Sequence, residues 1–326
     1  MMSPQSRRRT RAGDHPGRLK AMSRPSVRAL LLGAVLFGVV EPVVLAQGGQ
    51  PPDEPSVTLR GQTYTPRSIL SRNMGSEEDQ TTAFPPHKVV DNIYYVGTRT
   101  LSSFLITTPA GHILINSTYE RNVRTIEKSV TQLGFKFSDV RILLGTHAHG
   151  DHQEGDSLTK ELTGARVMVM REDVPALEAI KPGGKVHPID RTLRDGEEVA
   201  LGGTTLVAHL TAGHTRGCTT WTMHAREVGK DLNVVFACSY RAPGNVTAEI
   251  ESEFNRTFKM LRSLPCDVPL GDHPAQYAMM AKYARLGAGG PNPFIDAKNC
   301  WAEAEIQEAM LKAQLQLQRK TSRGPK

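Results

Sequence analysis

The stretch THAHGDHQEG, residues 146–155, directly follows the apolar run Val140–Leu144 (VRILL). The run is typical of a buried strand, so the polar stretch begins where that strand ends. Within six positions the stretch offers four side chains of types that bind zinc: His147, His149, Asp151 and His152. Alternate residues of an extended loop point the same way, so the first two can face one ion. A helix that starts at the following glycine would turn the other two toward a second ion.

Two further histidines follow other predicted strands. His214 stands in TAGHTRGCTTW after Leu206–Leu210, and His273 stands in LGDHPAQY after Val268–Leu270. Strand ends can deliver ligands to one sheet edge, so we expect the six side chains to meet there. Two sets of three would hold two zinc ions and leave positions open for water, as catalysis requires. The remaining histidines fit no such pattern. His15 lies in the N-terminal 46 residues, His87 in a proline-rich loop and His112 next to a turn. We expect the isolated His187, His209 and His224 to be surface or core residues.

Short β-rich runs alternate with helical patterns along the chain. The predicted strands are Val89–Val96, Ser103–Thr107, His112–Ile115, Val140–Leu144, Val167–Met170, Leu206–Leu210, Thr219–Met223 and Asn233–Ala237. The predicted helices are Glu120–Leu133, Val174–Ile180, Glu251–Leu264 and Asn299–Arg319. This interleaving predicts an α/β (α+β) fold in which helices cover the faces of sheets. No glycine-rich phosphate loop follows a strand, which argues against nucleotide binding.

The first 46 residues have the layout of a leader and secretory signal peptide. The apolar run Ala29–Val40 is 12 residues long and follows Arg24 and Arg28, so it is too short to span a membrane. Small residues at 44 and 46 predict cleavage after Ala46, with Met22 as the true start. An uncleaved membrane anchor is the alternative.

Charge supports the division of the chain into a leader and a body. The whole chain has a net charge of +7, but residues 47–326 hold 32 basic and 31 acidic residues. This balance gives no support to nucleic-acid binding. Residues 47–60 are polar and rich in proline, so we expect 47–79 to be a flexible mature N-terminus without a core. Residues 80–326 are expected to form the folded domain.

The motifs HxHxDH and GHTxGxTxW, with a late histidine after LPCDVxLG, resemble the metallo-β-lactamase superfamily. Within it the chain is similar to class B β-lactamases of the third subclass, over roughly residues 80–315. The resemblance implies an αββα sandwich of two mixed sheets, with helices outside and zinc at one sheet edge. It assigns the first zinc to His147, His149 and His214, and the second to Asp151, His152 and His273. His152 discriminates between subclasses, because the first subclass usually has Arg there.

The resemblance also implies roles in the segment CSYRAPG, residues 238–244. Ser239 matches a serine that is common in the substrate-contacting stretch of the family. Arg241 replaces a second serine, and its guanidinium could hold a substrate carboxylate through two hydrogen bonds. A solvent-facing loop arginine is the alternative. Cys238 lies beside the place of a zinc-binding cysteine of the first subclass, but the presence of His152 favours a structural role.

Four cysteines follow the predicted leader: Cys218, Cys238, Cys266 and Cys300. An even count permits disulfides in an oxidising compartment, but spacing alone does not pair them. No CxxC arrangement occurs, which argues against a cysteine zinc knuckle. The resemblance implies a bridge between Cys266 and Cys300. Whether Cys218 and Cys238 form a second bridge or are two buried thiols stays open.

The function implied by the resemblance is hydrolysis of the β-lactam amide bond of penicillins, cephalosporins and carbapenems, which confers antibiotic resistance. Two zinc ions would activate water, and Asp151 would both bind zinc and orient the nucleophile. The alternatives are another hydrolase on this scaffold, such as a lactonase or glyoxalase-II-like thioesterase, and a non-catalytic zinc-binding periplasmic protein. Those hydrolases typically carry an acid where this chain has Cys238 and Ser239. We expect a periplasmic or secreted monomer that acts on a small molecule, without nucleic acid or a membrane anchor.

Overall fold

The computed structural model describes residues 54–322, and the predicted leader lies outside this range. The described part holds a seven-stranded sheet, a five-stranded sheet and a two-stranded hairpin. None of its helices is long and apolar enough to cross a membrane. The two larger sheets face each other across the main hydrophobic core.

The first sheet has the strand order β3-β4-β5-β6-β7-β8-β9. Its strands are β3 (His87–Val90), β4 (Ile93–Tyr95), β5 (Phe104–Thr108), β6 (Gly111–Ile115), β7 (Val140–Leu144), β8 (Arg166–Met170) and β9 (Arg191–Leu193). Strands β3 to β6 are antiparallel, whereas β6 to β9 run parallel. Parallel strands place their carboxyl ends at one sheet edge, and residues 146–155 leave the sheet at that edge.

Both faces of the first sheet are buried, which explains the continuous apolar sequence of β7. Ile142 and Leu144 belong to the core between the two sheets. Leu143 points to the opposite face and belongs to a second cluster, under helix α3 (Val123–Gln132). Three α3 residues at helical spacing belong to the same cluster: Val123, Ile126 and Val130.

The second sheet has the order β10-β11-β12-β13-β14. Its strands are β10 (Glu198–Leu201), β11 (Thr204–Leu210), β12 (Thr219–Glu227), β13 (Lys230–Ala237) and β14 (Val268–Gly271). Neighbours are antiparallel except for the parallel pair β13 and β14. Aromatic side chains join the two sheets: the ring centroids of Phe104 on β5 and Phe236 on β13 are 5.1 Å apart.

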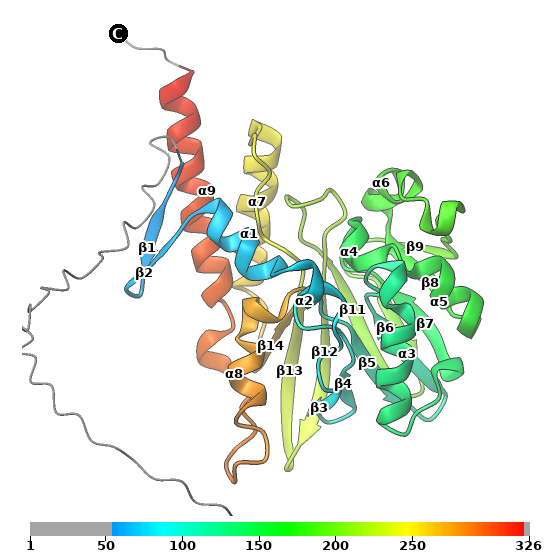
Figure 1. The fold of residues 1–326 in the computed structure, drawn as a ribbon. Coiled ribbons are helices and arrows are strands. Elements are labelled where there is room, and N and C mark those ends of the chain that lie inside the picture. The colour runs from blue at the N-terminus through cyan, green and yellow to red at the C-terminus, as the bar shows by residue number, and fades with distance from the viewer. Residues whose placement is uncertain (1–53, 323–326) are drawn as a thin grey trace, which may run out of the picture. The chain divides into compact units, whose positions relative to one another are not determined.

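Helices lie outside both sheets (Figure 1). Besides α3, they are α1 (Pro66–Met74), α2 (Glu77–Thr81), α4 (Gly150–Gln153), α5 (Asp156–Thr163), α6 (Val174–Ala179), α7 (Ala248–Leu261), α8 (Met279–Tyr283) and α9 (Ala302–Thr321). Helices α7 and α9 share an apolar cluster that includes Phe254, Phe258 and Leu311. The succession of helix, sheet, sheet and helix confirms the expected αββα sandwich.

The expectation of one strand over Val89–Val96 is wrong. The chain forms a hairpin there, with β3 and β4 on either side of Asp91 and Asn92. Asp91 has a positive φ of 47°, a conformation that Asp and Asn tolerate in turns. Its carboxylate also accepts a hydrogen bond from the backbone N–H of Arg226 (2.8 Å), so a contact remote in sequence holds the turn.

The expectation of a flexible segment up to residue 79 is also wrong for residues 57–79. This part forms the hairpin β1 (Val57–Leu59) and β2 (Gln62–Tyr64), followed by α1 and α2. Ile69 is fully buried. Arg60 and Arg72 pair with Glu305 and Glu303 of α9, at 2.7 and 2.6 Å. A polar segment is thus ordered by ion pairs with a helix at the other end of the chain.

Candidate metal centre

The structure brings His147, His149 and His214 together. One ring nitrogen from each lies within 4.8 Å of the other two, a spacing that could hold a metal ion. The three ring centroids form a triangle with sides of 4.7 Å. Two of these side chains come from the loop after β7, and the third comes from the loop after β11. We call this set the first trio.

Asp151, His152 and His273 also meet, and we call them the second trio. Asp151 Oδ2 lies 3.1 Å from His152 Nε2 and 3.8 Å from His273 Nε2. Ligands about 2.0–2.2 Å from one tetrahedral zinc are roughly 3.3–3.6 Å apart, so these separations suit a shared ion. The ring centroids of His147 and His152 are 4.2 Å apart, so the two trios lie side by side.

Contacts from both sheets fix the loop after β7 and the start of α4, which together carry four of the six side chains. Asn116, at the end of β6, accepts hydrogen bonds from the backbone N–H (3.0 Å) and hydroxyl (3.1 Å) of Thr146. From the second sheet, Trp221 Nε1 donates to the carbonyl of Gly145 (3.1 Å). A Cβ at Gly145 would lie 2.0 Å from Gln153 Oε1, so glycine is required for α4 to fold back on the strand end.

Asp173 links the loops that carry the first trio. Its buried carboxylate accepts the backbone N–H of Ala148 (2.8 Å), the hydroxyl of Thr215 (2.9 Å) and the backbone N–H of Gly217 (2.6 Å). A Cβ at Gly217 would come within 2.5 Å of the Asp173 backbone nitrogen. The residue before His149 and the residue after His214 are therefore attached to one carboxylate, which positions both histidines.

Three of the imidazoles have a hydrogen-bond acceptor or carboxylate at Nδ1. His214 Nδ1 lies 2.7 Å from the carbonyl of Arg241, and His273 Nδ1 lies 3.0 Å from the carbonyl of Thr100. His147 Nδ1 lies 3.2 Å from Asp272 Oδ2. A hydrogen on Nδ1 leaves the lone pair on Nε2, which is the form that binds a metal.

The residues of the two trios fit a cation. His147 Nε2 is buried and has no hydrogen-bond partner among the described residues, as expected of a nitrogen that is directed at a metal ion. Burial of the His152 cation is unfavourable, but Asp151 and Asp272 outweigh this effect and raise the pKa of His152. The protein thus favours positive charge at this point. The nitrogen and carboxylate donors match the preferences of zinc.

Positive charge is disfavoured on the histidines of the first trio themselves. Burial, followed by the neighbouring His149, lowers the pKa of His214 to about 3. Burial and the adjacent histidines also lower the pKa of His147 well below its ordinary value. These imidazoles are therefore neutral near pH 7, which is the state required of metal ligands. Burial disfavours ionisation of Asp151, but His152 and the other histidines hold its pKa well below the ordinary value.

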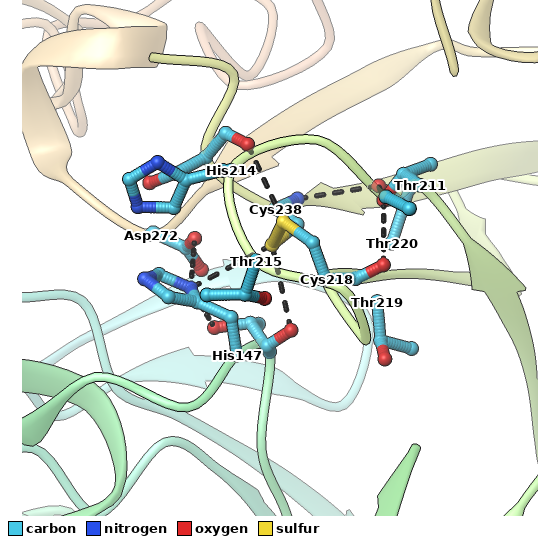
Figure 2. Close-up of a disulfide and its surroundings, with 12 residues drawn as sticks. His147, Thr211, His214, Thr215, Cys218, Thr219, Thr220, Cys238 and Asp272 are labelled. Carbon is cyan, nitrogen blue, oxygen red and sulfur yellow. Dashed lines mark hydrogen bonds and ion pairs between the residues drawn. A yellow bond between two sulfur atoms is a disulfide. The ribbon is translucent and has the colours of Figure 1, made fainter. Parts of the chain in front are cut away.

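Both pairs of cysteines are bridged. Cys266 and Cys300 form a disulfide, as the sequence resemblance implied. Cys218 and Cys238 form the second, which answers the question that spacing left open. This second bridge is completely buried beside the first trio: Cys238 Sγ lies 3.6 Å from His147 Nδ1 (Figure 2). No free cysteine remains among the described residues.

The two predicted substrate contacts lie in the loop that follows β13. Ser239 is buried, whereas Arg241 is half-buried. The positive charge of Arg241 contributes to the lowered pKa values of His149 and His214. Its guanidinium is therefore close enough to the first trio to act on it electrostatically.

The histidines outside the two trios have other surroundings. His87 is buried and stacks on Tyr95, and His187 Nε2 lies 3.0 Å from the buried carboxylate of Asp156. His209 bonds Thr222 across the second sheet. His112 lies on β6, within the range of the predicted strand His112–Ile115.

Asp272 and Asp173 were not among the predicted site residues. Asp272 directly precedes His273 in LGDHPAQY, so its place beside a strand end was visible in the sequence. Asp173 lies in a 3₁₀ turn after β8, and no sequence signal relates it to the loops that it holds.

Known proteins share this architecture. The profile of the metallo-beta-lactamase superfamily matches residues 96–228. The native FEZ-1 metallo-beta-lactamase from Legionella gormanii is 40% identical and superposes with a TM-score of 0.69, over 74% of this chain and 98% of that one. The chain belongs to the metallo-β-lactamase superfamily. BJP-1, a subclass B3 metallo-beta-lactamase of Bradyrhizobium japonicum, is 34% identical with a TM-score of 0.68, over 75% of this chain and 98% of that one.

A relative that is named for a different hydrolase activity matches this chain more weakly. A hydroxyacylglutathione hydrolase of a Methylobacterium species is 27% identical over 54% of this chain and 61% of its own length. This match is shorter and less similar than those to the β-lactamases. The superfamily of hydrolases and the resemblance to its third β-lactamase subclass are confirmed, and members of this superfamily normally bind zinc.

Proposed function

We propose that this protein is a zinc-dependent β-lactamase that hydrolyses the amide bond of penicillins, cephalosporins and carbapenems and so confers antibiotic resistance. The observation that carries the proposal is the pair of trios side by side at the sheet edge, each with three metal-binding donors. We assign one zinc ion to His147, His149 and His214. We assign a second to Asp151, His152 and His273.

Zinc bound there would polarise the lactam carbonyl and lower the pKa of a water molecule toward neutrality. The protein's own residues would position these reactants. The second oxygen of Asp151 could accept a proton from the attacking water and orient it, which makes Asp151 the proposed catalytic residue. Asp272 and Asp173 would keep the histidines in place during turnover.

We assign the substrate carboxylate to Arg241, with Ser239 as a second contact in the same loop. A guanidinium can bind a carboxylate through two parallel hydrogen bonds. The contribution of Arg241 to the lowered pKa values of His149 and His214 supports this role, because such an effect requires a positive charge near the first trio.

The main rival is a thioesterase of the hydroxyacylglutathione hydrolase type. In such enzymes an acidic residue is expected after the GHT motif, to bridge both metals. This chain has Cys238 and Ser239 there, and Cys238 is bonded to Cys218. A disulfide sulfur cannot replace a bridging carboxylate, so the local chemistry supports the lactam substrate.

We further propose that the mature protein acts in the periplasm or outside the cell, as a monomer without a membrane anchor. Disulfides persist in oxidising compartments, and the two bridges use all four cysteines of the chain.

A panel of substrates tests the proposed reaction. Nitrocefin and meropenem should be hydrolysed, and an acyl-glutathione thioester and a simple lactone should be turned over far more slowly. Faster turnover of the thioester than of either β-lactam would favour the rival. No turnover of any of them by fully metallated protein would favour the non-catalytic alternative.

Metal analysis tests the proposed stoichiometry. The purified protein should contain two zinc ions per chain and lose activity to a chelator. Full turnover with one zinc ion at saturation would refute the paired site.

A further inference from the structure

The two sulfur atoms of the Cys218–Cys238 bridge lie beside His147, a proposed zinc ligand (Figure 2). Both sulfurs and a ring nitrogen of His147 lie within 4.8 Å of one another. The ring nitrogen that faces the sulfurs is Nδ1, which lies 3.6 Å from Cys238 Sγ. The other nitrogen, Nε2, is the one without a hydrogen-bond partner among the described residues. The sulfurs therefore approach His147 on the side away from the proposed zinc ligand atom.

The backbone spacing of the pair suits a metal as well as a bridge. The two Cα atoms are 5.9 Å apart. Two thiolates on one tetrahedral zinc, each at about 2.3 Å, have their sulfurs roughly 3.8 Å apart. Opening of the bond and rotation of the side chains can supply this separation without movement of the strands. The charges also balance, because two thiolates neutralise a buried divalent cation.

We propose that reduction of the Cys218–Cys238 bridge creates a separate metal site, formed by the two thiolates and Nδ1 of His147, that takes a soft divalent cation. This proposal does not depend on the β-lactam substrate. Thiolates favour soft and borderline cations, so Cd²⁺ is the sharpest probe and Zn²⁺ the relevant biological ion.

The chemistry balances with a phosphine as the reductant. The phosphine transfers two electrons to the S–S bond and takes an oxygen from water, which yields a phosphine oxide and two thiols. Each thiol then releases its proton to solvent as its sulfur binds the cation. The oxidised chain cannot form this site, since both sulfurs are committed to the bridge.

The thiolate site competes with the first trio for His147. A neutral imidazole carries a single free lone pair, on one of its two nitrogens. When Nδ1 binds the cation beside the sulfurs, the hydrogen moves to Nε2 and the ring can no longer serve the trio. The bridge therefore keeps His147 available to His149 and His214.

Cadmium titration of the full chain tests the proposal. Because both cysteines are fully buried, the bridges are reduced by phosphine in denaturant, and the chain is refolded without oxygen or metal and freed of phosphine. The readout is the ultraviolet charge-transfer absorbance of sulfur-bound cadmium. In the reduced protein it should reach the amplitude of one sulfur-bound cadmium ion per chain, and it should stay absent in the oxidised protein.

Variants that lack one or the other pair of cysteines identify which pair produces the absorbance. In the C266S/C300S variant the only cysteines are Cys218 and Cys238, and the absorbance should appear on reduction as in the wild type. In C218S/C238S it should be absent. H147A should weaken cadmium binding at this site by more than about tenfold, since loss of a direct ligand exceeds the effect of losing a ligand's partner. The matched H149A variant should not weaken it, because His149 belongs only to the competing first trio.

Three results would overturn the inference. They are a reduced wild-type chain without the absorbance, a C218S/C238S chain that retains it, and equal behaviour of H147A and H149A. Each can occur whether or not the oxidised protein hydrolyses β-lactams, so failure here is distinguishable from failure of the proposed function.

Discussion

At the residue scale, His149 and His209 form a matched pair. His149 belongs to the first trio, whereas His209 lies on β11 and bonds Thr222. We predict that His149→Ala removes one zinc ion and lowers turnover by several orders of magnitude. His209→Ala should stay within about threefold of wild type, because a residue remote from the reacting atoms makes no transition-state contact. Turnover and metal content of both variants measure this, and equal behaviour would refute the ligand assignment.

Arg241 is proposed to hold the substrate carboxylate. A charge-assisted hydrogen bond contributes about 1.5–3 kcal/mol, so Arg241→Ser should raise KM by roughly ten- to a hundredfold and change kcat less. For a substrate whose carboxylate is esterified the effect should shrink, because the partner of the guanidinium is absent. Steady-state kinetics on the acid and its ester measure this. An unchanged KM for the free acid would contradict the role.

Asp272 is proposed to orient His147. Asp272→Asn keeps the shape of the side chain but loses the charge that faces Nδ1 of His147. Loss of such a partner weakens metal binding by about 10–100-fold, and we predict this range for zinc. Competition with a chromophoric chelator measures the affinity. Asp231→Asn, at an exposed position that pairs with Arg226, is the control and should bind zinc like the wild type.

The six proposed ligands could be named from the sequence because each follows a strand and has a chemically distinctive side chain. The role of the Asp173 carboxylate, which holds two of the loops that carry them, could not be predicted. Asp173 acquires its role only when the loops after β7 and β11 are adjacent, and adjacency of loops is a property of sheet packing. The pairing of Cys218 with Cys238 depends on the same packing.

At the element scale, helix α8 buries a lysine. Lys282 Nζ lies 3.1 Å from Asp296 Oδ2, and burial lowers the pKa of Lys282 from 10.5 despite that partner. Between the lowered value and 10.5 the unfolded chain holds the proton and the folded chain has released it. The free energy of unfolding therefore gains a contribution that rises with pH across this window.

We predict that this rise is absent from Lys282→Met. Urea unfolding at several alkaline pH values gives the difference in the free energy of unfolding between the wild type and the variant. The ionisation of tyrosines contributes equally to both proteins and cancels in this difference. Lys312→Met, at an exposed position on α9, is the control and should follow the wild type. A constant difference between wild type and Lys282→Met across the window would contradict the prediction.

Periodicity located most strands and helices of the sandwich, because their apolar faces are nearly complete. It failed where order comes from polar contacts that are remote in sequence. Residues 57–79 carry helix-start signals at Thr65 and Ser76 but few apolar positions, and two of their ion-pair partners are Glu303 and Glu305 on α9. The turn at Asp91 was hidden within an apolar run for the same reason, as its hydrogen bond comes from Arg226.

At the scale of the whole molecule, the Cys266–Cys300 bridge ties the chain just before β14 to the segment that leads into α9. The two cysteines are 34 positions apart. Closing a loop of this length stabilises the folded state by ~3–4 kcal/mol in the chain-entropy model. C266S/C300S should lose about this much in the free energy of unfolding and keep its zinc sites. Urea titration and metal analysis measure both, and full stability without the bridge would contradict the prediction.

The first trio takes two side chains from the loop after β7 and one from the loop after β11. The second takes two from α4 and one from the segment after β14. During translation neither trio is complete at first. The first trio is complete once His214 has been synthesised, and the second once His273 has been synthesised. A chain that stops early can bind at most one of the proposed ions and lacks the stabilisation that metal binding adds. Under the proposed assignment of two ions, full resistance to proteases therefore requires a chain that extends beyond β14.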